Sequence, residues 1–163
     1  LVGKNIYMES IKDIFFSGTF GGETLSLAAA KAVLIKLKKD KVIKYWTELG
    51  IYLHKELDKL INDLDISFFL SFSGHPSWSF LIFKDTQNAN LWELKTLFMQ
   101  EMFKCGIFTL GAQTLSYAHK KSDIDYLLNS YRSVFSIIKE SIENNSIQSK
   151  LECKTLQPLF SVR

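Results

Sequence analysis

Proline, glycine and an excess of one charge are all scarce in this chain. Two prolines and eight glycines are spread over 163 residues, and 20 basic against 17 acidic side chains leave a formal net charge of only +3. Disordered and collagen-like chains have very different compositions, so both classes are excluded. With 47% hydrophobic residues in a length close to that of one domain, the sequence predicts a folded chain with a substantial core.

Cysteine and histidine are also few and far apart. Cys105 and Cys153 lie 48 positions apart without a CxxC motif, and His54, His75 and His119 are scattered along the chain. Disulfide frameworks and zinc sites need closer and more regular spacing. We therefore expect two unpaired thiols and no metal site.

Long hydrophobic runs are missing as well. No stretch approaches the ~18 uninterrupted apolar residues of a membrane span, and the N-terminus lacks the apolar core and cleavage site of a signal peptide. We expect a cytoplasmic protein without membrane contact. Because the chain opens at Leu1 instead of methionine and enters an apolar-polar pattern at once, we expect it to be part of a longer protein.

Arginine occurs only twice, as Arg132 and Arg163, although lysines cluster between Lys31 and Lys44. Arginine is the side chain that reads phosphates and guanine in a bidentate manner. A lysine cluster without arginine, in a nearly neutral chain, is typical of a solvated surface. The sequence therefore predicts no nucleic-acid partner.

Hydrophobic periodicity predicts an α+β fold with a small antiparallel sheet. Spacings of three and four residues predict helices, whereas alternation predicts strands. Helices are expected over residues 4–12 (weakly), 23–39, 41–64, 90–104 and 122–144, and strands over 66–72, 78–82, 107–110 and 114–118. His75 is expected in the turn between the first two strands, and Ser122 with Asp125 as a capping box of the last helix. The 13 phenylalanines follow these stripes, which favours a core or a subunit interface.

The most informative segment is residues 17–23, directly before the helix predicted at 23–39. Gly18, Gly21 and Gly22 fall within five residues, and Ser17 and Thr19 add two hydroxyls. Such a loop before a helix N-terminus offers main-chain N–H groups and hydroxyl donors to a phosphate, and its glycines indicate unusual backbone angles or close approach of another group. It is neither a Walker loop nor GxGxxG. A plain loop in which Thr19 caps the helix is the alternative.

Read together, FSGTFGGETLSLAAA (residues 16–30) resembles the segment that follows the cofactor lysine in class III aminotransferases. These pyridoxal-phosphate (PLP) enzymes include glutamate-1-semialdehyde aminomutase. LVGK (residues 1–4), followed by YM (7–8), resembles the family's strand just past the lysine. LSYAH (115–119) resembles the family's last strand, and DID (123–125) resembles the start of its last helix. The likeness covers about residues 1 to 140.

The resemblance implies the C-terminal part of a fold-type-I PLP enzyme. Residues 1–22 would end the large cofactor domain with a phosphate-contacting loop, 23–40 would be a connecting helix, 41–144 the small α+β domain and 145–163 a polar tail. In the family, the threonine of the motif hydrogen-bonds the cofactor phosphate of the neighbouring subunit. That role falls on Thr19, flanked by Gly18 and Ser17, in a homodimer whose sites are shared between subunits. Glu23 stands where the family usually has asparagine.

The resemblance implies that the family's Schiff-base lysine lies upstream of this chain, which would then contain no catalytic residue. The whole enzyme would move an amino group between small molecules or within one, whereas this stretch alone would be inactive. No arginine lies near the C-terminal strands, which disfavours an amino-dicarboxylate substrate. His119 resembles a histidine after the family's last strand and is expected to be a structural hydrogen-bonding residue. The alternative function is a non-enzymatic small domain used for oligomerisation or binding.

Overall fold

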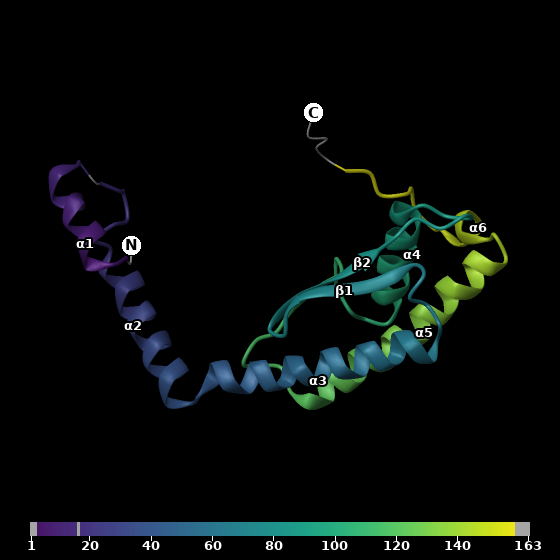
Figure 1. Cartoon of the computed structure of the whole chain (residues 1–163), viewed down its shortest axis with the longest axis horizontal. Coiled ribbons are helices and arrows are strands. Elements are labelled where there is room, and N and C mark those ends of the chain that lie inside the picture. The colour runs from purple at the N-terminus through teal and green to yellow at the C-terminus, as the bar shows by residue number, and fades with distance from the viewer. Residues whose placement is uncertain (1–2, 16, 159–163) are drawn as a thin grey trace. The chain divides into compact units, whose positions relative to one another are not determined.

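The computed structural model describes residues 3–15 and 17–158. The chain divides into two compact units, Leu1–Lys41 and Val42–Arg163, and each is described by itself (Figure 1). The likeness at Leu1, Val2 and Phe16 falls outside the described residues.

The first unit is a run of short helical segments followed by one long helix. It contains α1 (Asn5–Met8), a 3₁₀ helix (Glu9–Asp13) and α2 (Thr24–Lys39). The helix expected at residues 4–12 is thus two short pieces. None of the three segments contains a buried residue, and residues 3–15 and 17–41 together form no hydrophobic core of their own.

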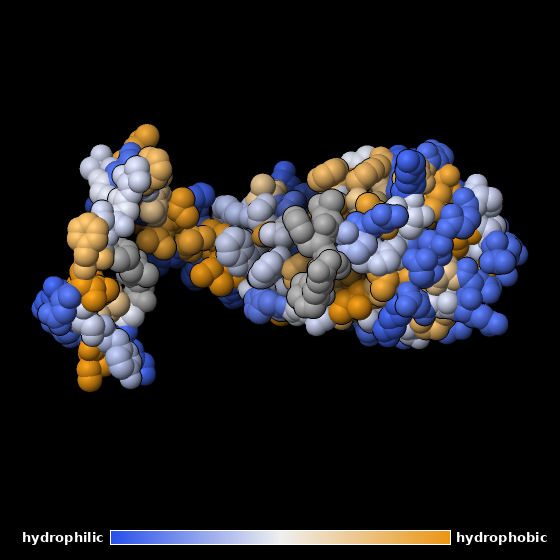
Figure 2. All heavy atoms as spheres, turned by 90° about the horizontal axis from the view of Figure 1, so that it is seen from above, coloured by the Kyte–Doolittle hydropathy of each residue, from blue (hydrophilic) through white to orange (hydrophobic). Residues whose placement is uncertain are grey.

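Exposed hydrophobic side chains cover much of α2. Leu25, Leu27, Val33, Leu34 and Ile35 are each more than half exposed, and Figure 2 shows hydrophobic surface on this unit. Helices that are apolar on several faces are normally buried in a larger core. The composition of α2 is therefore that of a helix with packing partners on more than one side.

The second unit is an α+β domain, which confirms the predicted fold class. Its helices are α3 (Val42–Asp63), α4 (Leu91–Lys104), α5 (Lys121–Glu143) and α6 (Ile147–Lys150), and its sheet contains β1 (Leu70–His75), β2 (Trp78–Phe83) and β3 (Ala112–Thr114). The sheet is antiparallel in the order β1-β2-β3. In Figure 1, α3 and α5 run side by side along the unit.

The core lies between one face of the sheet and the helices. Leu81 and Phe83 of β2 are buried, and Phe83 meets Phe98 of α4 with ring centroids 5.2 Å apart. Phe98 in turn packs on Tyr131 and Phe135 of α5. These contacts join the hairpin, α4 and α5 into one hydrophobic cluster.

The face of β2 that points away from the core carries large apolar side chains, although it is partly exposed to solvent. Trp78, Phe80 and Ile82 are 58%, 42% and 41% exposed, while Ser79 beside them is fully buried. A core role is wrong for these three side chains, because the residues that alternate with them along β2 are the buried ones. An interface role stays a prediction.

Three strand predictions are wrong: those at residues 66–72 and 114–118 in extent, and that at 107–110 in existence. β1 begins at Leu70 because residues 66–69 form turns after α3, with Phe69 N–H and Leu70 N–H donating to the Ile66 carbonyl. Residues 107–110 form no strand, and the following strand pairs only over Ala112–Thr114. Ile66 and Phe69 are fully buried, whereas Phe68 is 49% exposed. The alternation placed Phe68, and not Phe69, on the side of Ile66, so it was wrong about burial at these two positions as well as about conformation.

Two predictions at chain reversals also need correction. His75 is the last residue of β1 and not part of the turn, although its Nδ1 lies 2.9 Å from the hydroxyl of Ser77 in that turn. The last helix begins at Lys121, so Ser122 is not its N-cap. Instead the Asp123 carboxylate accepts the Lys120 N–H at 2.7 Å. The carboxylate of the capping box is thus that of Asp123, two residues before the expected Asp125.

Residues after Asn144 pack on α4. Gln100 donates to the Lys150 carbonyl at 2.9 Å and accepts the Glu152 N–H at 2.7 Å, and Leu156 N–H donates to Thr96 Oγ1 at 2.9 Å. Side chains of α4 therefore hold the main chain of the described part of residues 145–163 by hydrogen bonds.

Candidate functional site

The predicted phosphate-contacting loop is a tight turn at the start of α2. Gly21 N–H donates to the Gly18 carbonyl at 3.0 Å, which places Thr19 and Phe20 at the middle of the turn, and both are exposed. The Thr19 hydroxyl is thus presented at the surface of the first unit. Ser17 and Gly18 precede it and are exposed as well.

Gly18 and Gly22 are not required by the backbone of this loop. Positive φ angles occur at Gly74, Gly106 and Gly111, and not at Gly18 or Gly22. A Cβ at Gly18 or Gly22 would meet no described atom within 4 Å. The expected unusual backbone angles are therefore wrong for these two positions, and close approach of an outside group remains as the reason for a missing side chain.

Glu23, and not Thr19, caps α2. Its carboxylate accepts the N–H groups of Leu25 at 2.9 Å and Ser26 at 2.5 Å. The hydrogen bond from the Ser26 side chain, followed by these main-chain bonds, holds the pKa of Glu23 below its ordinary value. The capping interpretation of Thr19 is wrong. A phosphate at this loop would therefore have to use donors from the turn itself, since the Leu25 and Ser26 N–H groups are already engaged.

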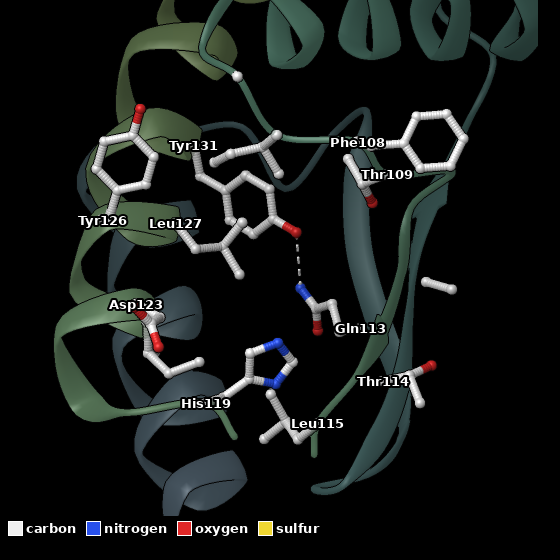
Figure 3. A pocket seen from close by; sticks show the side chains of 14 residues that line it. Phe108, Thr109, Gln113, Thr114, Leu115, His119, Asp123, Tyr126, Leu127 and Tyr131 are labelled. Carbon is white, nitrogen blue, oxygen red and sulfur yellow. Dashed lines mark hydrogen bonds between the residues drawn. The ribbon is translucent and has the colours of Figure 1, made fainter. Parts of the chain in front are cut away.

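The second unit contains a cavity of about 480 Å³ between β3, the residues around Gly106 to Thr109 and the first turns of α5 (Figure 3). Ile107, Leu115, Ile124 and Leu127 supply much of its apolar wall. His119 also lines it. The cavity thus combines hydrophobic walls with a small number of polar groups, which is the usual make-up of a ligand site.

Two of the residues that line this cavity, Gln113 and Tyr131, belong to a chain of buried hydrogen bonds. Ser79 Oγ donates to Gln113 Oε1 at 2.6 Å, and Gln113 Nε2 donates to the Tyr131 hydroxyl oxygen at 3.2 Å. Tyr131 is 1% exposed. Burial raises the pKa of Tyr131 to about 12 against the opposing effect of the Gln113 hydrogen bond, so the phenol stays protonated at neutral pH.

The sequence did not single out Ser79, Gln113 or Tyr131. The sequence did hold one indication of their role. In β2 and β3 the buried positions of the alternating pattern include the polar residues Ser79 and Gln113, where apolar residues are usual. Polar groups at inward positions must find partners. Pairing of strands far apart in the chain was needed to reveal which ones.

His119 has the structural role expected of it. Its Nδ1 accepts the Ser116 N–H at 3.0 Å, and its carbonyl accepts the Tyr45 hydroxyl at 2.8 Å. The first bond closes the turn before α5, and the second joins that turn to α3. The ring's Nε2 has no hydrogen-bond partner among the residues that the structure describes, and the ring lines the cavity (Figure 3).

The remaining candidates carry no cluster of functional groups. His54 is half-buried against Phe72, and its Nε2 has no hydrogen-bond partner in the described structure. Cys105 and Cys153 are both free thiols. Among residues 3–15 and 17–158, no group of three metal-binding side chains is found, and no helix is long and apolar enough to cross a membrane.

The fold of the chain is that found in part of a PLP-containing protein. Its solved structure is that of the PLP internal aldimine form of the FumI protein from Sphingopyxis sp. MTA144, which this chain matches with a TM-score of 0.73 and 19% sequence identity. The match covers 87% of this chain and 34% of the FumI chain, so this chain spans about a third of that protein's length. No protein-family model and no curated protein sequence matches the chain.

Proposed function

We propose that this chain is the C-terminal part of a PLP-dependent aminotransferase or aminomutase similar to class III aminotransferases. The observation that carries the proposal is the structural likeness to FumI over 87% of the chain, together with the residues that independently resemble the family's motif at 16–30. The whole protein would transfer an amino group between small molecules, or shift one within a molecule.

The turn at residues 17–22 has donors that suit the cofactor phosphate. The Thr19 hydroxyl is exposed, and Gly18 and Gly22 leave room for close approach because no Cβ covers the backbone there. Hydroxyl and main-chain N–H groups bind phosphate without needing a full positive charge. In this proposal Thr19, Gly18 and Ser17 hold the phosphate, and the bound cofactor supplies the electron sink for amino-group chemistry. The lysine that carries the cofactor belongs to the rest of the enzyme.

We infer that the phosphate held by Thr19 belongs to a neighbouring subunit. Phe15 and Phe20 beside the turn are 96% and 79% exposed, and apolar side chains of this size favour a protein interface. The full-length protein would then be a homodimer with shared sites. A monomer in light scattering that still binds PLP tightly would contradict this arrangement.

Thr19→Val in the full-length enzyme tests the cofactor role. Loss of a hydrogen bond to a charged oxygen lowers affinity by roughly tenfold to a hundredfold, so PLP should dissociate more readily. Thermal stability of the PLP-free protein should not change, because Glu23 caps α2. Thr24→Val, which removes a nearby hydroxyl on α2, is the matched control. Equal PLP affinity in both variants would refute the assignment to Thr19.

A non-enzymatic binding or oligomerisation domain is the second candidate. The exposed apolar residues of α2 and the stripe of Trp78, Phe80 and Ile82 favour it. Under the first proposal the 163-residue chain mixed with PLP gives no specific Schiff-base absorbance. Stoichiometric labelling of one lysine, trapped with borohydride, would instead place the cofactor lysine within this chain. A full gene that encodes no lysine-bearing segment before Leu1 would favour the second candidate.

A further inference from the structure

The cavity beside α5 presents hydrogen-bond donors that the protein itself leaves unused. Tyr131 accepts a hydrogen bond from Gln113 Nε2, and Gln113 Oε1 is occupied by the Ser79 hydroxyl. The proton of the Tyr131 hydroxyl has no acceptor among residues 3–15 and 17–158. A buried hydroxyl proton without an acceptor is costly, and Tyr131 lines the cavity from which an acceptor could come.

Gln113 adds a second donor to the same end of the cavity. A side-chain amide carries two N–H groups, and the structure uses one of them, toward Tyr131. Gln113 is 5% exposed and lines the cavity. Its second N–H is therefore placed beside the phenol.

His119 supplies a third donor from the opposite side. Because Nδ1 accepts the Ser116 N–H, the neutral ring carries its proton on Nε2. Figure 3 shows the His119 ring and the Tyr131 hydroxyl facing the middle of the cavity, with Gln113 between them.

We propose that this cavity binds a small organic carboxylate whose oxygens accept hydrogen bonds from Tyr131, Gln113 and His119. A carboxylate has acceptor sites for all three donors and donates to none, and hydrogen bonds to an ionised acceptor are the stronger kind. The apolar wall of Ile107, Leu115 and Leu127 suits an aliphatic body.

One acidic side chain lines the same cavity. Asp123 is exposed, and one of its oxygens accepts the Lys120 N–H that starts α5. Its charge is thus engaged with the helix N-terminus, where a negative charge is stabilised. A ligand whose carboxylate lies against Tyr131, Gln113 and His119, and whose apolar tail extends from there, would keep its negative charge beside these donors. The cavity is lined by residues of the second unit alone, and binding there does not depend on the proposed function.

The test is an NMR titration of the 163-residue chain with hexanoate, using 1-hexanol as a neutral probe of the same chain length. Hexanoate should shift the amide resonances of Gln113, Leu115 and His119, and hexanol should bind much more weakly. Tyr131→Phe should weaken hexanoate binding by roughly tenfold to a hundredfold. Tyr126→Phe is the matched control, because Tyr126 also lines the cavity but donates its hydroxyl to the Cys105 carbonyl.

His119→Asn gives a second readout if Tyr131→Phe fails to fold. The asparagine oxygen can replace Nδ1 as acceptor of the Ser116 N–H, while the Nε2 donor is lost, so hexanoate affinity should fall with the turn intact. Shifts spread over the surface, equal binding of hexanoate and hexanol, or equal hexanoate affinity in Tyr131→Phe and Tyr126→Phe would each overturn the proposal. So would no shift at tens of millimolar hexanoate.

Discussion

Gly50 of α3 lies against the main chain of Pro76 in the turn between β1 and β2. A β-carbon built on Gly50 would stand 2.0 Å from the Pro76 carbonyl oxygen and 2.4 Å from its carbon. No side chain fits in that space, so the glycine allows the helix to approach the hairpin. Position 50 thus ties the tip of the sheet to the first helix of the unit.

Gly50→Ala should destabilise the second unit, although alanine has the higher helix propensity. Alanine gains about 1 kcal/mol in an isolated helix, whereas forcing a methyl group into packed structure costs roughly 1–3 kcal/mol. Backbone atoms at 2.0 Å cannot give way cheaply, so the packing cost should win. Urea denaturation measures the free energy of unfolding. Ile51→Ala, at an exposed neighbour on α3, should change it by less than about 0.5 kcal/mol, and equal effects of the two variants would contradict the steric explanation.

The N-terminus of α2 should fray in acid because of Glu23. A folded-state pKa below the ordinary 4.5 means that the cap is complete above pH 4.5 and is lost as the pH falls through the lowered value. Amide exchange at Leu25 and Ser26, which donate to this carboxylate, should accelerate over that window relative to the intrinsic rate. Glu23→Gln should remove the pH dependence. A cap that survives well below the window would show that other groups hold the helix end.

His54 should make the second unit less stable in mild acid. Burial, and then the charge of His75, lower the pKa of His54 below 6.5, so protonation favours the unfolded chain. Its contribution to stability is complete above pH 6.5 and is lost as the pH falls through the lowered folded value. His54→Phe keeps a ring against Phe72 and removes the unpartnered Nε2, so thermal unfolding should depend less on pH between 7 and 5. His75→Gln, as control, should retain most of the dependence, and equal slopes in wild type and His54→Phe would exclude His54 as the cause.

Gln100 should hold the segment after α6 against α4. Its side chain makes two hydrogen bonds with that segment, at the Lys150 carbonyl and the Glu152 N–H. Gln100→Ala should therefore increase trypsin cleavage after Lys150 and Lys154 several-fold, with little change in global stability. Gln87→Ala, at an exposed position before α4, serves as control. Cleavage at the same rate in both variants would mean that Leu156 and the ion pair of Lys104 with Glu152 suffice.

Local patterns in the sequence determined the helices and the fold class. The stripes of α3, α4 and α5 repeat over many turns, so the apolar side is evident without tertiary information. Alternation predicted three strands that exist and one, at residues 107–110, that does not, and it predicted strand extent poorly. Residues 66–69 alternate as a strand would and instead form turns, because hydrogen bonds to the Ile66 carbonyl outweigh the local preference. The segment at 107–110 likewise found no pairing partner over its length in the described structure.

At the residue 17–22 turn the sequence identified the candidate residues, and the tertiary structure decided the role of each. The motif at residues 16–30 is local, so it could be recognised directly, yet only the structure showed that Glu23 caps α2 and frees Thr19 from that role. The cavity could not be found from the sequence, because Ser79, Gln113 and Tyr131 meet through pairing of β2 with β3 and packing on α5. Local preferences act over a few residues, whereas burial and hydrogen-bond partners depend on segments that only folding brings together.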